Sequence, residues 1–162
     1  MINLAEIYKE YRQGFFSLAL SVTRNAAEAE DAVHDAFVKL SSKNIQIKGK
    51  AVPYVFAVVR NAALDRVRKR KKIVDAPEFI FDEQLSEERA PGLSLQERER
   101  NFIIRKELEK LDEPQREVVI LKLFSGLTFE EISEITGEPL STVSSRYART
   151  LKSLKYKMES LV

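Results

Sequence analysis

The stretch "LTFEEISEITGEPLSTVSSRYARTLKSLK", from Leu127 to Lys155, predicts two helices joined by a tight turn. Thr128 and Glu131 have the spacing of a capping box, which marks the start of a helix. Gly137 is the residue type that most often ends a helix in a left-handed conformation. Two short helices joined in this way are typical of a helix-turn-helix, whose second helix lies in the DNA major groove.

The second helix of the pair, expected to start at a cap on Ser141 or Thr142, divides into an apolar stripe and a polar face. The stripe predicted to be buried consists of Val143, Tyr147, Leu151, Leu154 and Met158. Near the helix start the polar face carries Ser144, Ser145, Arg146 and Arg149, followed by Lys152. Small residues let a helix approach the groove closely, and arginine donates paired hydrogen bonds to guanine or binds phosphate. The face is therefore predicted to contact duplex DNA, the alternative being a solvated surface of an ordinary helix.

Charged residues are distributed unevenly along the chain. Residues 1–72 carry 14 Lys and Arg against 7 Asp and Glu, residues 73–101 carry 3 against 8, and residues 102–162 carry 10 of each. No segment alternates in hydrophobicity with period two, whereas several follow the three- and four-residue steps of a helix face. The sequence predicts an all-α protein with two small helical domains, 1–72 and 102–162, joined by an acidic, flexible linker, 73–101, that is extended or mobile.

Three helices are expected in the first domain. Apolar residues from Leu4 to Val22 recur at helical spacing, and "RNAAEAEDAVHDAFVKLSS" repeats the pattern with an acidic opposite face. A loop is expected from Ser41 to Val52, after which Pro53 suits the first turn of a third helix.

The third helix ends in "RVRKRKK", six cations in seven residues. Basic side chains follow phosphates, and Tyr54, if exposed beside the loop, would stack on unpaired bases. The alternative is a solvated helix end whose cations complement the helix dipole, with Tyr54 packed. Phe56 is expected to be a core residue.

Several classes of protein are excluded by what the sequence lacks. It has no cysteine and one histidine, so it offers no disulfide, thiolate metal site or paired His ligands. There is no Gly-rich phosphate loop, no Ser-His-Asp set, no secretory signal and no run of about 18 apolar residues. We expect a cytoplasmic protein that is not an enzyme, has no metal or cofactor, and makes no membrane contact of its own.

Three motifs in order carry a family resemblance: "RNAAEAEDAVHDAFVKL", "YVFAVVRNAALDRVRKRKK" and "LDEPQREVVILKLFSGLTFEEISEITGEPLSTVSSRYARTLKSLK". They resemble regions two and four of an extracytoplasmic-function (ECF) sigma factor of the sigma-70 family, a bacterial transcription initiation factor. The resemblance covers about Leu4 to Lys72 and Phe102 to Lys157. It implies that residues 1–72 are sigma region 2 and residues 102–162 are sigma region 4, with its helix-turn-helix.

The resemblance also implies a role for each group of residues. The minus-ten promoter element would be bound and opened by the loop from Ser41 to Val52 and by Tyr54, Arg60, Asn61, Asp65, Arg66 and Arg68. The minus-thirty-five element would be read by Ser144, Ser145, Arg146, Arg149 and Lys152. The clamp coiled coil of the polymerase beta-prime subunit would bind Glu30, Asp31, His34 and Asp35. The implied partners are core RNA polymerase, including its beta flap, promoter DNA and an anti-sigma factor.

Three other functions are compatible with parts of the sequence. A stand-alone helix-turn-helix regulator with an N-terminal dimerisation domain would bind duplex DNA without polymerase. A basic helical nuclease would need catalytic groups. The one histidine, His34, lies on an acidic helix face, where a surface or interface role is expected rather than a catalytic one. An inhibitor of another sigma factor would not need the cationic second helix.

Overall fold

The computed structural model describes residues 3–42, 50–71 and 94–160, and across these ranges it contains helices and no strand. The helices are α1 (Leu4–Thr23), α2 (Ala26–Ser42), α3 (Ala51–Lys71), α5 (Leu95–Glu109), α6 (Glu113–Val119), the π-helix η1 (Ile120–Phe124), α7 (Phe129–Thr136) and α8 (Leu140–Ser160). The all-α prediction is confirmed. None of the described helices is long and apolar enough to cross a membrane. Most of the predicted 41–52 loop and of the predicted linker lies outside the described residues.

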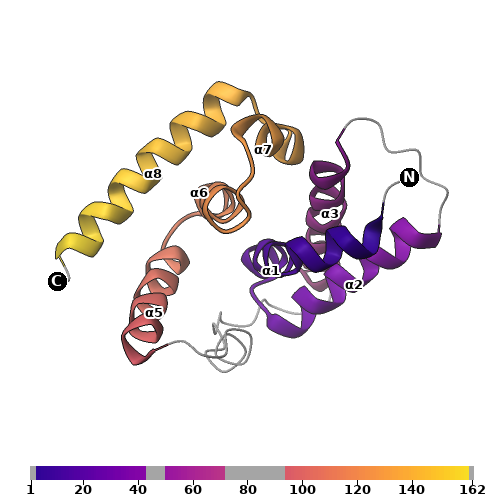
Figure 1. Ribbon diagram of the computed structural model, residues 1–162, viewed down its shortest axis with the longest axis horizontal. Helices are drawn as coiled ribbons and strands as arrows, with labels where there is room; N and C mark the ends of the chain where they lie inside the picture. The colour runs from indigo at the N-terminus through magenta and orange to yellow at the C-terminus, as the bar shows by residue number, and fades with distance from the viewer. Residues whose placement is uncertain (1–2, 43–49, 72–93, 161–162) are drawn as a thin grey trace.

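Helices α1, α2 and α3 pack against one another as a first bundle, seen on the right of Figure 1. The Asn3 side chain caps α1 by accepting a hydrogen bond from the Glu6 N–H, and Asn25 does the same for Glu28 at the start of α2. The centre of the bundle is aromatic, since the rings of Phe15 and Phe56 lie 4.4 Å apart. The prediction that Phe56 is a core residue is confirmed.

Helix α5 begins inside the segment predicted to be linker. Ser94 and Glu97 form a full capping box, each side chain bonding the backbone N–H of the other residue, so the chain is helical from Leu95. The prediction of extended chain is therefore wrong over residues 95–101. The many charged residues in this stretch suggested a linker, although the Ser-x-x-Glu pattern that marks the start of a helix is present in the sequence.

The second bundle is built from α6, η1, α7 and α8, with α5 beside it. At the start of α7, the Thr128 and Glu131 side chains form the predicted capping box, and Gly137 ends the helix with φ 75°. Helix α8 starts at Leu140, because the Val143 N–H already bonds the Pro139 carbonyl. The prediction of a cap at Ser141 or Thr142 is therefore wrong, and both residues lie in the first helical turn.

The apolar stripe of α8 is buried along only part of its length. Val143 and Leu154 are buried, and Tyr147 and Met158 are half-buried. Leu151 is 37% exposed, contrary to expectation. Here the helix extends beyond α7, and its remaining apolar partners are a small cluster around Leu108 and Val119.

One continuous core joins the two bundles. Helix α3 packs on α7, and α1 packs on α6 and η1, so that α6 and α7 lie between α8 and the first bundle in Figure 1. Buried residues of the first bundle, such as Phe15, belong to the same cluster as Val118, Leu121 and Ile132 of the second. This shared core fixes where the candidate functional surfaces lie relative to one another.

Candidate nucleic-acid interfaces

The outer face of α8 presents a row of small and basic side chains. Ser145, Arg149 and Lys152 are exposed, and Ser144 is half-buried with its hydroxyl donating to the Ser141 carbonyl. A shallow depression on this face is lined by Ser141, Thr142, Ser145, Ala148 and Arg149. Sequence reasoning missed Ser141 and Thr142 as candidate contacts because it started the helix too late. The signal for Ser141 was the four-residue spacing of positions 141, 145 and 149, which places the three residues on one helix face.

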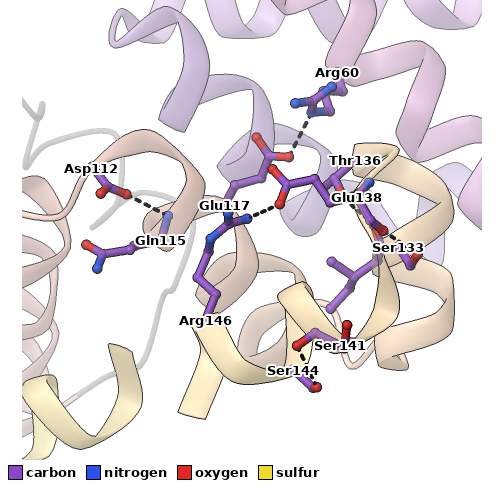
Figure 2. A network of polar contacts seen from close by, with 11 residues as sticks. Arg60, Asp112, Gln115, Glu117, Ser133, Thr136, Glu138, Ser141, Ser144 and Arg146 are labelled. Atoms are coloured by element: carbon purple, nitrogen blue, oxygen red, sulfur yellow. Dashed lines mark hydrogen bonds and ion pairs between the residues drawn. The ribbon is translucent and has the colours of Figure 1, made fainter. Parts of the chain in front are cut away.

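Arg146 lies on a different side of α8 from that row. Its guanidinium donates to a Glu138 carboxylate oxygen at 2.6 Å, and its side chain is only 21% exposed (Figure 2). Glu138 is itself held in the turn, since its carbonyl accepts from the Ser133 hydroxyl and its N–H donates to Thr136. Arg146 therefore ties the second helix of the helix-turn-helix to the turn before it.

Residues predicted to serve two different partners meet between α2 and α3. Arg66, predicted to contact DNA, lies 2.6 Å from a carboxylate oxygen of Asp35 and 3.7 Å from one of Asp31, both predicted to contact polymerase. Further along, Arg70 pairs with Glu28. These ion pairs attach the basic end of α3 to the acidic face of α2, while both aspartates remain exposed.

The other predicted minus-ten residues are distributed along α3. Asn61, Asp65 and Arg68 are exposed, and Arg68 pairs weakly with Asp65 at 3.5 Å. Asn61 and Asp65 also line the groove between α2 and α3. Tyr54 is half-buried and packs against the shared core, which is the alternative foreseen for it.

The remaining predicted polymerase-binding residues lie on the exposed side of α2. Glu30 and His34 are both exposed. They line a groove between α1 and α2 together with the aromatic side chains of Tyr8 and Phe37. In the described ranges, no group of three or more His, Asp or Glu side chains is arranged to hold a metal ion.

Arg60 connects the two bundles. Its Nε donates to a carboxylate oxygen of Glu117, on α6, at 2.7 Å, and the Glu117 side chain is only 4% exposed (Figure 2). Burial raises the pKa of Glu117, and the nearby carboxylates of Glu113 and Glu138 raise it further, while Arg60 opposes the shift. Sequence reasoning missed Glu117, although its position directly before the apolar run "VVIL" is a signal that the side chain is buried with a partner.

Two sigma-70 family models match the chain: "Sigma-70 region 2" matches residues 7–73 and "Sigma-70, region 4" matches residues 101–154. The RNA polymerase sigma factor SigV of Bacillus subtilis (strain 168) is 27% identical over 151 residues, covering 92% of this chain and 87% of SigV. The ECF RNA polymerase sigma factor SigW of the same organism is 26% identical over 172 residues, covering 97% and 89%. The chain belongs to the ECF class of the sigma-70 family.

Two solved structures share the fold of this ECF sigma factor. One is the sigma factor RpoE in complex with the anti-sigma factor NepR from Bartonella quintana, with a TM-score of 0.66, 23% identity, and coverage of 95% of this chain and 97% of that one. Another is CnrH in complex with the cytosolic domain of CnrY, with a TM-score of 0.63 and 18% identity, covering 96% and 87%.

The two family matches assign each candidate surface of this sigma factor to one region. Region 2 contains the groove between α2 and α3 together with Arg60, and region 4 contains the outer face of α8 together with Glu117 and Glu138. The Arg60–Glu117 ion pair therefore joins region 2 to region 4. As a member of this family, the protein is a transcription initiation factor.

Proposed function

We propose that this sigma factor binds core RNA polymerase and directs it to promoters with a minus-thirty-five and a minus-ten element, where it assists melting. The observation that carries the proposal is the presence of two surfaces suited to nucleic acid on two different regions. One is the outer face of α8, with small residues beside Arg149 and Lys152, and the other is the basic half of α3.

Region 4 reads the minus-thirty-five element in this proposal. Ser145 and the missed residues Ser141 and Thr142 let the first turns of α8 approach the groove floor, and Arg149 supplies the bidentate donor. Lys152 follows the phosphates. Arg146 acts mainly as a positioning residue, because its guanidinium already binds Glu138.

Region 2 opens the minus-ten element. Asn61, Asp65 and Arg68 are exposed on α3, and Tyr54 lies near the start of the same helix. No catalytic chemistry is needed, because capture of unpaired bases shifts the duplex equilibrium against an unstacking cost of a few kcal/mol per base.

The exposed acids of α2 face core polymerase. The beta-prime clamp coiled coil binds Glu30, Asp31, His34 and Asp35. Charge complementarity between the two surfaces sets the orientation and the association rate more than the affinity. Region 4 contacts the beta flap, and an anti-sigma factor holds the protein between uses, which the solved complex of the sigma factor RpoE with the anti-sigma factor NepR supports. The protein works in the cytoplasm, where polymerase and promoters are.

Run-off transcription with reconstituted core polymerase on genomic fragments tests this function. The wild-type chain is expected to co-elute with core polymerase and to initiate at specific fragments. Arg149→Ala should weaken promoter use by about 1–3 kcal/mol if a base contact is lost, while polymerase binding persists. Lys155→Ala, an exposed change further along α8, is the matched control.

Failure to bind core polymerase, together with tight palindromic DNA binding by the chain alone, would support the stand-alone regulator instead. Normal transcription by the Arg149→Ala variant would show that the reading face of α8 is misassigned.

A further inference from the structure

The guanidinium of Arg66, a residue predicted to contact the minus-ten element, is directed at the acidic face of α2. Its Nε and Nη2 donate to one carboxylate oxygen of Asp35 at 3.2 and 2.6 Å, and its Nη1 lies 3.7 Å from a carboxylate oxygen of Asp31. We propose that Arg66 belongs to the polymerase-binding surface and not to the DNA-binding one: it partly neutralises Asp31 and Asp35 and thereby slows the capture of core polymerase. The ion pairs stand on geometry alone, whereas their effect on polymerase capture rests on the proposed function.

The surroundings of Arg66 disfavour DNA. A guanine edge requires two parallel donors, and the Nε and Nη2 of Arg66 already donate to Asp35. A phosphate would have to approach past the carboxylates of Asp31 and Asp35, whose side chains are 63% and 54% exposed and repel it. The Arg66 side chain is 31% exposed, against 73% for Arg68. Arg68 is therefore the arginine of the two that DNA reaches.

Arg66 changes the charge that α2 presents to a partner. Asp31 and Asp35 lie one helical turn apart, a spacing at which two like charges repel each other. The cation beside both carboxylates reduces this repulsion and makes the electrostatic potential of the α2 face less negative. Because both carboxylates remain more than half exposed, polymerase can still reach them. Arg66 therefore attenuates a binding surface that stays accessible.

The attachment of α3 to α2 does not depend on Arg66. Ion pairs between exposed side chains contribute little to stability. The two helices share a buried core that includes Ala36 and Val59, and Arg70 pairs with Glu28 further along. Removal of the Arg66 side chain should therefore leave the bundle folded and change mainly its surface charge.

The direction of the effect follows from electrostatic steering. A change of charge at an exposed part of a binding surface alters mainly the association rate and its dependence on salt. Arg66→Ala removes the cation beside Asp31 and Asp35, so the chain should associate with core polymerase about threefold faster at low salt, a small share of the roughly 10- to 1,000-fold that steering supplies in total. Because the charges are exposed, added salt should screen this gain.

Stopped-flow binding of the full-length chain to core RNA polymerase measures the association rate at several salt concentrations. Arg66→Ala should be faster than wild type at low salt and equal to it at high salt. Arg66→Lys keeps the positive charge and should stay close to the wild-type rate. Lys155→Ala removes one cation from an exposed site on α8 and should match wild type. Circular dichroism checks that each variant keeps its helical content.

Promoter use is measured separately, by run-off transcription with sigma factor in saturating excess over core polymerase, so that the rate of capture no longer limits the signal. Arg66→Ala should then transcribe as well as wild type. Arg68→Ala, on the exposed side of the same helix, should transcribe less in the same assay. This difference between two neighbouring arginines separates the polymerase-binding role from the DNA-binding role.

Each outcome decides the proposal. An Arg66→Ala association rate at or below that of wild type, or a faster rate that salt does not reduce, would overturn the attenuation. Lower transcription by Arg66→Ala at saturation would return Arg66 to the DNA-binding surface. Both results leave the proposed function standing. If wild type itself does not bind core polymerase, the proposed function fails, and the role of Arg66 fails with it.

Discussion

Removal of either partner of the Arg60–Glu117 ion pair is expected to have unequal effects on stability. The Glu117 side chain is 4% exposed and that of Arg60 is 24% exposed, so only the arginine can turn to water when its partner is lost. Arg60→Ala leaves a buried carboxylate without a cation, which typically costs 3–5 kcal/mol. Partial water access to the site places the expected loss at the lower end, about 3 kcal/mol.

Glu117→Gln keeps the side-chain volume and an oxygen that accepts from Arg60, so its expected cost is about 1 kcal/mol. The double variant has no buried charge left to compensate. It should therefore lose about 2 kcal/mol, rather than the roughly 4 kcal/mol of simple addition, which corresponds to a coupling of about 2 kcal/mol.

Urea unfolding at pH 7, followed by far-ultraviolet circular dichroism, measures these free energies of unfolding. Arg68→Ala is the control, because Arg68 and its partner Asp65 are both exposed and the change should stay within about 0.5 kcal/mol. Equal losses for Arg60→Ala and Glu117→Gln, or additive losses in the double variant, would refute the claim that Glu117 is held buried by Arg60.

Two further predictions concern pH and the turn of the helix-turn-helix. Since burial raises the pKa of Glu117 above its ordinary 4.5, the folded protein binds this proton more tightly than the unfolded chain does. Its contribution to stability is fully present below the ordinary pKa and is lost as pH rises through the raised one. Urea titrations should thus show wild type gaining stability relative to Glu117→Gln on acidification, and a constant difference would contradict this. Gly137→Ala should lower the free energy of thermal unfolding by about 1 kcal/mol, because φ is 75° at this position. Gly137→Asn should lose less. If Gly137→Ala is as stable as wild type, the turn relaxes to accept the side chain.

Much of the fold was predictable because its signals are local. The capping box of Thr128 and Glu131, the left-handed Gly137 and the buried Phe56 follow from neighbouring residues and helical periodicity, and the structure confirms each of them. The capping box at Ser94 was equally local but lay in a highly charged stretch that suggested extended chain. The candidate DNA-reading face of α8 was predictable only in part, because the start of the helix was placed two or three residues too late.

The partners of the candidate site residues were not predictable from local pattern. Arg66 meets Asp35 across 31 positions of sequence, and Arg60 meets Glu117 across 57. A periodic pattern shows which residues lie on the surface of one helix, but not which helix covers that surface. Arg146 was therefore taken for a free recognition residue, whereas Glu138 in the preceding turn binds it.

The sequence by itself determined most of the helices, several of their caps, the family and part of the candidate DNA-binding surfaces, because each depends on residues close together along the chain. Only the tertiary structure decided that regions 2 and 4 share one core, that Gly14 gives η1 room to approach α1, and that Arg60 is paired with a buried carboxylate. The physical reason is that packing and burial are properties of distant segments brought together. A charged side chain acquires its partner and its pKa from that packing.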